Sequence, residues 1–391
     1  MKSIHLPLLL GIFASLLGGS VPAREQSSEA GAPKLSLSIR CTNAVVKAGD
    51  EISIEFRITN GGTNEYKYAD RTYDRSGRME EYMLVVKTAS GELVPDPRAT
   101  YTGGIAGGLH GYKTLKSGES FTKVIPLNRW ALVKEAGRYE VVGHYPSVLF
   151  GSNSVVVTSA PITITVQPRS EKELYAYICS LTNQLAALAT NKDYSHRGEV
   201  DTLVMKLMFT CSPKIVPTLL NTMYEAERGF WESEALQFYV PRSDKVKRAI
   251  LSVAAKRGLA SGMQYVLTGY GCDRDDFVPL IKASLAPENR TSWQEGALAA
   301  QQYSDDAFTP RLIALATERN GAARGRAIYA LALNRTDEGV QALKALLVDA
   351  DKNIRSTTEN AIRTAYRYRG NSKGRLLKPE DFDSSYQQAE R

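Results

Sequence analysis

The 391-residue sequence contains few of the side chains that most often carry catalytic or metal-binding chemistry. Its four cysteines never occur in CxxC spacing, so the sequence predicts no zinc site. Its four histidines form neither an HExxH motif nor a spacing typical of a catalytic triad. A G-x-S-x-G nucleophile motif is also absent. We therefore predict no catalytic residue, no metal and no cofactor from motifs, and an enzyme with an unrecognised site stays open as an alternative.

Long apolar runs are equally scarce, and the most prominent one stands at the N-terminus. MKSIHLPLLLGIFASLLGG has Lys2, an apolar run from Leu6 to Leu17, and then small residues. The run is shorter than the roughly 20 residues that a helix needs to cross a bilayer. With Val21 and Ala23 it predicts a secretory signal peptide over residues 1–23. We expect an exported protein, periplasmic or extracellular, that does not span a membrane.

The composition is that of a soluble globular protein, with 43% hydrophobic and 23% charged residues. The length suits two domains. The formal net charge of +7 fits an ordinary basic surface or attraction to an acidic partner. Behind a signal peptide, we expect that partner to be a protein or an anionic envelope polymer, and we do not expect nucleic acid.

The first half alternates apolar and polar residues in short runs separated by turn residues. EISIEFRIT, RYEVVGHY and ITITV are examples, with KAGDE, NGG and EAGR as turns. After a flexible linker over residues 24–33, the pattern predicts an antiparallel β-sandwich over residues 34–167. Tyr139 follows a tight Gly turn and opens a strand, which is the place of the tyrosine corner in immunoglobulin-like sandwiches. On these residues the first half resembles bacterial immunoglobulin-like domains.

After residue 167 the apolar period changes from two to that of a helix. Ser170 and Glu173 have the spacing of a capping box, and helical spacing then continues to about Arg369. FVPLIKASL and FTPRLIALA begin 31 residues apart, and extending this step in both directions gives an aliphatic column at Leu219, Ile250, Ile281, Leu312 and Leu343. We predict an α-solenoid of stacked helical hairpins over residues 170–370, followed by a disordered tail over residues 371–391.

The repeated segment resembles the short HEAT-like helical repeats that also occur in phycobilisome lyases. The resemblance covers Ile215 to Arg369, and RGFWESEALQFYVPRSD departs from it. It implies a HEAT-like fold and says little of function. Cys179 and Cys211 fall on predicted helices one hairpin apart and are the pair best placed for a disulfide, with four buried thiols as the alternative.

Two stretches are rich in residues that often make contacts with partners. The first, Asn64 to Tyr82, holds Tyr66, Tyr68, Arg71, Tyr73, Arg75 and Arg78. Tyrosine and arginine offer large contact areas and directed hydrogen bonds, and both are frequent in binding hot spots. The alternative is that these tyrosines pack on the predicted sandwich.

The second stretch is RTAYRYRGNSKGRLLK, which no acidic residue interrupts. It holds Arg363, Arg367 and Arg369. These residues are candidates for contact with an anionic or acidic partner, and the alternative is the polar end cap that a repeat array needs.

Together these patterns predict an exported, non-enzymatic binding or scaffold protein with a β-sandwich followed by an α-solenoid. The binding surface is expected on the solenoid groove or the Tyr/Arg-rich segment. The alternatives are an enzyme or enzyme subunit of the lyase-like HEAT type, and a sandwich domain that acts as a proteinase inhibitor.

Overall fold

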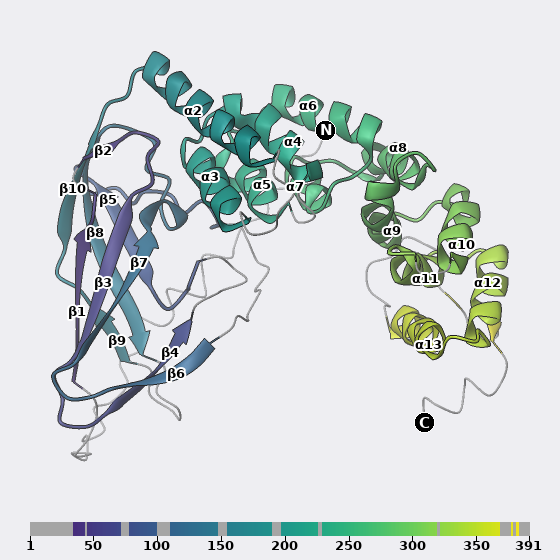
Figure 1. Cartoon of the computed structure of the whole chain (residues 1–391), viewed down its shortest axis with the longest axis horizontal. Helices are drawn as coiled ribbons and strands as arrows, with labels where there is room; N and C mark the ends of the chain where they lie inside the picture. The colour runs from purple at the N-terminus through teal and green to yellow at the C-terminus, as the bar shows by residue number, and fades with distance from the viewer. Residues whose placement is uncertain are drawn as a thin grey trace, which may run out of the picture.

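The computed structural model describes residues 34–43, 45–71, 78–99, 110–147, 155–189, 197–225, 229–318, 321–367, 377, 381 and 382. Within these residues, an N-terminal β region is followed by a C-terminal region of twelve α-helices, so the predicted order of a β half and a helical half is confirmed. Figure 1 shows the helices leading away from the sheets in a curved row. The predicted signal peptide (1–23) and linker (24–33) lie outside the described residues.

The described β region has three sheets. Its strands are β1 (Leu35–Cys41), β2 (Val46–Lys47), β3 (Ser53–Asn60), β4 (Tyr66–Arg71), β5 (Met83–Thr88), β6 (His110–Leu115), β7 (Ser120–Pro126), β8 (Gly137–Ser147), β9 (Val155–Thr158) and β10 (Ile162–Gln167). One sheet has the antiparallel order β1-β3-β7, and a second has the order β2-β10-β8-β5, with β9 also paired to β8. In the second sheet β2 runs parallel to β10, and its other pairings are antiparallel. Strands β4 and β6 form an antiparallel pair.

The two larger sheets share one hydrophobic core. Ile39 on β1 is opposite Phe56 on β3, and both are buried. Gly143 on β8 lies against this pair so closely that an added Cβ would be 2.7 Å from Ile39 Cγ2 and 3.1 Å from Phe56 Cε1. A glycine is therefore needed where β8 approaches the β1-β3-β7 sheet. Burial on every second residue of β3 follows from the alternation of side chains along a strand.

Some of the helices begin at a residue whose side chain accepts from backbone amides of the first turn, and others begin without such a cap. The helices are α2 (Glu171–Ala189), α3 (Arg197–Phe209), α4 (Val216–Glu225), α5 (Phe230–Glu234), α6 (Asp244–Arg257), α7 (Met263–Gly269), α8 (Arg274–Leu285), α9 (Trp293–Gln302), α10 (Thr309–Thr317), α11 (Arg324–Leu333), α12 (Asp337–Leu347) and α13 (Lys352–Arg367). The predicted capping box is confirmed before α2: the Ser170 amide donates to Glu173 Oε2 (2.9 Å), and the Glu173 amide donates to Ser170 Oγ (3.2 Å). Asp273 accepts from two amides at the start of α8 in the same way.

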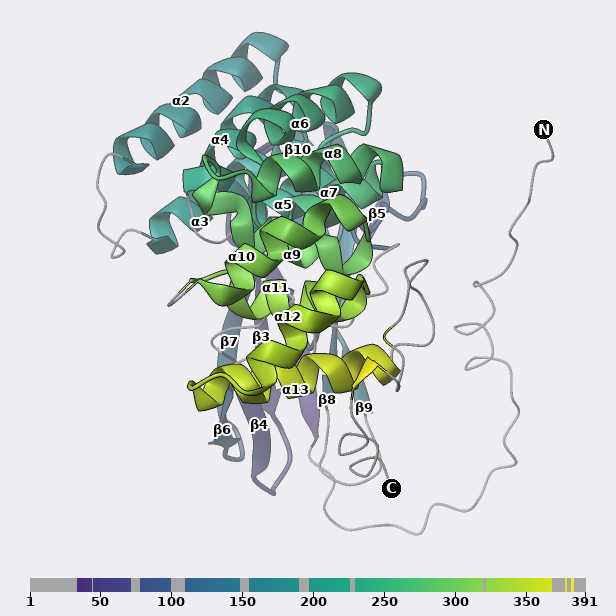
Figure 2. The same ribbon diagram turned by 90° about the vertical axis from the view of Figure 1, so that its right-hand side faces the viewer.

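The five aliphatic residues of the 31-residue column lie on every second helix. Leu219, Ile250, Ile281, Leu312 and Leu343 belong to α4, α6, α8, α10 and α12, and each is 0% exposed. Their predicted burial is therefore confirmed. Helix α6 contacts α4 and α8, α10 contacts α12, and α11 contacts α9 and α13. Figure 1 shows α6, α8, α10 and α12 along the outer edge of the row and α7, α9, α11 and α13 along its inner edge, and Figure 2 views the row from the α13 end.

Candidate functional site

The Tyr/Arg-rich segment turns two of its tyrosines into the β core. Tyr66 is 2% exposed and Tyr68 is 9% exposed. Tyr68 stacks on Phe121 with ring centroids 4.0 Å apart, and the hydroxyl oxygens of Tyr66 and Tyr145 are 3.3 Å apart. Burial raises the pKa of Tyr145, so its hydroxyl stays protonated and available for this hydrogen bond. Tyr66 and Tyr68 thus attach the β4–β6 pair to the core, which matches the packing alternative and removes them from the candidate surface.

The middle of this segment adds little to the candidate surface. Arg71 ends β4, where its backbone pairs with that of His110. Tyr73 and Arg75 lie outside the described residues. Contact with a partner through these three residues therefore stays a prediction.

Arg78 holds the end of the segment against the rest of the β region. Its side chain is 10% exposed and pairs with Asp96 at 2.5 Å. Its Nε donates to the carbonyl oxygen of Arg129 at 3.0 Å, and its guanidinium lies 4.3 Å from the centroid of the Trp130 ring. Each of these contacts is within the protein, so Arg78 is a structural link that leads to the junction of the two regions.

A buried ion pair joins the β region to the helices. Arg129 ends the 3₁₀ turn η1 (Leu127–Arg129), and Glu234 ends α5. Their side chains are 2.8 Å apart and only 2% and 4% exposed. The Arg129 guanidinium also lies 4.5 Å from the Trp231 ring centroid, and the Tyr239 hydroxyl donates to the carbonyl oxygen of Asn128 at 3.2 Å. Because a buried charge is costly without its partner, this pair fixes how the two regions meet.

A second set of contacts ties the start of α2 to the turn after β2. Arg169 pairs with Asp50 at 2.6 Å and donates to the carbonyl oxygen of Ala48 at 3.0 Å. Lys47 pairs with Glu173, the capping-box residue, at 3.0 Å. Polar contacts therefore link the two regions within the connection, at Arg169, and just after it, at Glu173. Helix α2 cannot rotate about this short connection without breaking them.

The C-terminal basic stretch is partly exposed on the last helix. Arg363 and Arg367 lie one helical turn apart on α13, and both are exposed. No described acidic side chain lies within ion-pair distance of either residue. Arg369 lies outside the described residues. The exposed pair suits contact with an anionic partner, and it suits the polar end cap as well.

Part of the expected tail contacts the helices. Leu377 and Phe382 are each 4% exposed and belong to the helical core. Between them, Asp381 accepts two hydrogen bonds from Arg335, at 2.7 and 2.6 Å. At these three positions the chain differs from the disordered tail expected over residues 371–391. The physical reason is that the apolar side chains of Leu377 and Phe382 are buried against the helical core and that the Asp381 carboxylate is paired with Arg335.

The inner edge of the row carries side chains that link successive helices. Gln264 on α7 donates to Gln302 on α9. Arg326 on α11 pairs with Glu295 on α9 at 3.3 Å. Tyr265 on α7 is 65% exposed. These contacts on the inner edge are polar, one between uncharged amides and one between opposite charges, and Tyr265 adds an exposed aromatic ring. We call these five residues the inner-edge set.

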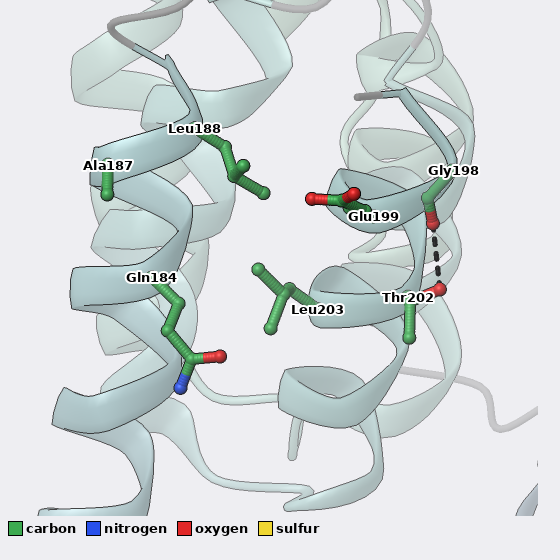
Figure 3. A pocket seen from close by; sticks show the side chains of 7 residues that line it. All are labelled: Gln184, Ala187, Leu188, Gly198, Glu199, Thr202 and Leu203. Carbon is green, nitrogen blue, oxygen red and sulfur yellow. Dashed lines mark hydrogen bonds between the residues drawn. The ribbon is translucent and has the colours of Figure 1, made fainter. Parts of the chain in front are cut away.

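An open cleft of about 710 Å³ lies between α2 and α3. It is lined by Gln184, Ala187, Leu188, Gly198, Glu199, Thr202 and Leu203. Figure 3 shows the Glu199 carboxylate directed toward Leu188 across the space, while the Thr202 hydroxyl donates to the Gly198 carbonyl oxygen at 2.7 Å. Among these seven lining residues only Glu199 is ionisable, so they supply no acid–base pair.

The four cysteines form no disulfide, and the described acidic residues form no metal-binding group. All four cysteines are free thiols, so the candidate Cys179–Cys211 pair is not bridged; of the four thiols expected to be buried in the alternative, Cys272 is buried and the other three are half-buried. Burial raises the pKa of Cys211 to about 11, which keeps it protonated. In the described part of the chain no group of three or more His, Cys, Asp or Glu side chains is arranged to hold a metal ion. None of the described helices combines the length and the apolar character needed to cross a bilayer.

Comparison with known proteins does not place the chain in a family. No protein-family model matches the sequence, and no curated protein is significantly similar to it. The function is therefore argued from the described surfaces and from the junction that holds them.

Proposed function

We propose that this chain is an exported, non-enzymatic binding or scaffold protein, built from an immunoglobulin-like β-sandwich and an α-solenoid of HEAT-like hairpins. Its partner is a protein or an anionic envelope polymer. The observation that carries the proposal is the column from Leu219 to Leu343, in which five residues spaced by 31 positions are completely buried on every second helix. Stacked repeats bury a continuous core between neighbours and leave a long face for a partner.

The β region supports the immunoglobulin-like part of the proposal through one hydrogen bond. The Tyr139 hydroxyl donates to the carbonyl oxygen of Glu135 at 2.9 Å, just before β8 begins. In immunoglobulin-like sandwiches, a tyrosine at the start of a strand bonds to the backbone a few residues upstream in this way. The core shared by the two larger sheets is in keeping with the same architecture.

The junction supports a scaffold role. The Arg129–Glu234 pair and the Arg169–Asp50 pair connect the two regions at separate places. A partner that contacts both regions therefore meets one preorganised platform, and no ordering of a flexible hinge opposes its binding.

The contact surface of the proposal is the inner edge of the row. Tyr265 is the aromatic residue of the inner-edge set, and an exposed tyrosine gives contact area at a small entropic cost. Gln264, Gln302 and the Glu295–Arg326 pair beside it supply hydrogen-bonding groups. This combination favours recognition of a surface over catalysis.

A capture experiment with matched tyrosine variants tests the binding role. The purified protein is immobilised and exposed to cell-envelope extract of its host, beside Tyr265→Ser and Tyr175→Ser. Tyr175, on α2, is 55% exposed and serves as the control. We expect one partner to be retained by the parent and the control but lost with Tyr265→Ser. Equal retention by both variants, or no retained partner, contradicts the proposal.

Export is a separate part of the proposal and rests on residues 1–23. N-terminal sequencing of the protein recovered from its host should find a chain that starts near Arg24. A recovered chain that still begins at Met1 contradicts export by a cleaved signal.

A further inference from the structure

Helix α6 has an unusually basic solvent face. Residues 242–257 contain six basic residues and one acidic residue, although the whole chain has a net charge of only +7. Lys245, Arg248 and Lys256 are exposed and follow one face, because they are spaced by three and eight residues. We call these three residues the basic stripe. The opposite face of α6 is buried in the helical core and consists of Val246, Ile250 and Ala254.

The 31-residue repeat provides an internal reference for this face. The exposed residues equivalent to Arg248 around α4, α8, α10 and α12 are all uncharged: Pro217, Pro279, Pro310 and Gln341. The residues that lie 31, 62 and 93 positions after Lys256 are Pro287, Glu318 and Asp349. The residues at the positions equivalent to Lys245 in the other four repeats are Lys214, Asp276, Ala307 and Glu338. Among these five helices, only α6 has a cation at all three positions, so the stripe is not a general property of the repeat.

The cations of the stripe are available to a ligand. No described acidic side chain lies within ion-pair distance of Lys245, Arg248 or Lys256. Their neighbour Lys247 differs, because it pairs with Asp276 of α8 at 3.4 Å. The exposed residues between the cations are small: Ala249, Ser252 and Ala255. A ligand can therefore approach the three cations without meeting a bulky side chain.

The shape of the stripe favours a linear ligand. It runs along one helix for about 17 Å, at a rise of about 1.5 Å per residue. The adjacent helix α8 exposes both signs of charge: Arg274 and Lys282 lie beside Asp275 and Pro279, and Arg274 pairs with Asp305 at 3.4 Å. The run of three cations that no described acidic side chain pairs with is therefore on α6. Helix α6 lies on the outer edge of the row, with its apolar face in the core, and so has no free apolar face to insert into a bilayer (Figure 1).

We propose that the basic stripe binds a linear polyanion, a polymer that carries carboxylate or phosphate groups along its chain. The inference rests on the proposed binding role and assigns it a second surface, separate from the inner-edge set. Lys and Arg attract such a chain by releasing its condensed counterions, so binding weakens steeply as salt is added.

Binding of labelled polygalacturonate and of labelled polyphosphate to the purified protein tests the stripe. The triple variant Lys245→Gln/Arg248→Gln/Lys256→Gln is compared with Lys87→Gln/Lys172→Gln/Lys344→Gln, which removes the same charge from exposed positions on β5, α2 and α12. We expect the stripe variant to lose about 10-fold or more in affinity at low salt and to flatten the salt dependence, whereas the scattered variant changes affinity by about 2-fold or less. Circular dichroism of both variants checks that they fold.

Either polymer binding through the stripe supports the proposal and identifies the anion. Equal losses in the two variants overturn it, because net charge alone then explains the binding. Binding to vesicles of phosphatidylglycerol but to neither polymer overturns it in favour of a membrane surface. If the stripe fails while Tyr265→Ser still abolishes capture, the inference is wrong and the proposed binding role stands.

Discussion

In the β region, paired strands are often distant in the sequence, as where β2 pairs with β10 and β4 with β6. In the helical region, each helix packs mainly against helices one or two places along the chain. The β core contains tyrosines held by individual contacts, such as Tyr66 and Tyr145, whereas the helical core repeats one aliphatic position five times. The difference teaches that equivalent substitutions should have similar effects in the helical region, while each buried β residue has its own effect.

The junction between the two regions should show the largest effect. Glu234→Ala removes the carboxylate that pairs with the buried Arg129 guanidinium at 2.8 Å, and we expect the unfolding free energy to fall by about 3–5 kcal/mol. Denaturant unfolding of the full chain measures the change. Arg129→Met/Glu234→Leu removes both charges and should cost less than Glu234→Ala alone. A cost below about 1 kcal/mol for Glu234→Ala shows that the pair does not hold the regions together.

The aliphatic column should show the next largest effect. Ile281→Ala and Leu312→Ala each empty a completely buried position, and each should cost about 2–5 kcal/mol. Lys282→Ala and Lys344→Ala change exposed neighbours on α8 and α12 and should stay within about 0.5 kcal/mol. The same unfolding measurement compares the four variants. Similar costs for the buried and exposed substitutions would remove the main support for a repeated core.

A hydroxyl deletion in the β core should have a smaller effect. Tyr145→Phe removes a partner of the Tyr66 hydroxyl and should cost about 0.5–1.5 kcal/mol, because a neutral hydrogen bond contributes about that much. Tyr265→Phe, at a position 65% exposed, is the control and should leave stability unchanged. If Tyr145→Phe is neutral, packing alone holds β4–β6 on the core.

The smallest effect should come from the pH dependence of the α2 cap. Hydrogen bonds from the Ser170 amide and hydroxyl, and then the contact with Lys47, lower the pKa of Glu173 to about 2. A lowered folded pKa adds stability above the unfolded pKa near 4.3, and this stability is lost as pH falls from about 4 to 2. Solvent screening keeps the contribution small. NMR titration of the Glu173 carboxyl measures the pKa directly, and a value near 4.3 contradicts the contacts with Ser170 and Lys47.

The sequence predicted the features that repeat or act locally. Helical spacing located the aliphatic column, and the Ser170–Glu173 pair marked the start of α2, because both depend on residues close together in the chain. The burial of Tyr68 was given by the sequence only as an alternative to a contact role. It depends on the pairing of β4 with β6, strands far apart in the chain, and on stacking against Phe121. A hydropathy pattern cannot specify such a pairing.

The junction was missed for the same reason, although one signal was present. Glu234 stands in the aromatic and apolar stretch FWESEALQFY, where a charged residue in a core position requires a buried partner. That partner, Arg129, is 105 residues earlier, and nothing local identifies it. The docking of Leu377 and Phe382 was missed because polar composition around them outweighed two apolar residues.

Deletion of one repeat unit tests most directly whether a single repeating unit builds the helical region. Removing residues 277–307 deletes 31 residues, which include most of α8 and all of α9. The deletion joins Asp276 to Phe308, so that Phe308 takes the repeat position of Phe277. Removing residues 291–306 takes out α9 alone, which is half a unit. We predict that the first variant unfolds in one cooperative transition with unchanged helix content per residue, and that the second does not. Failure of both variants, or equal success of both, contradicts the account.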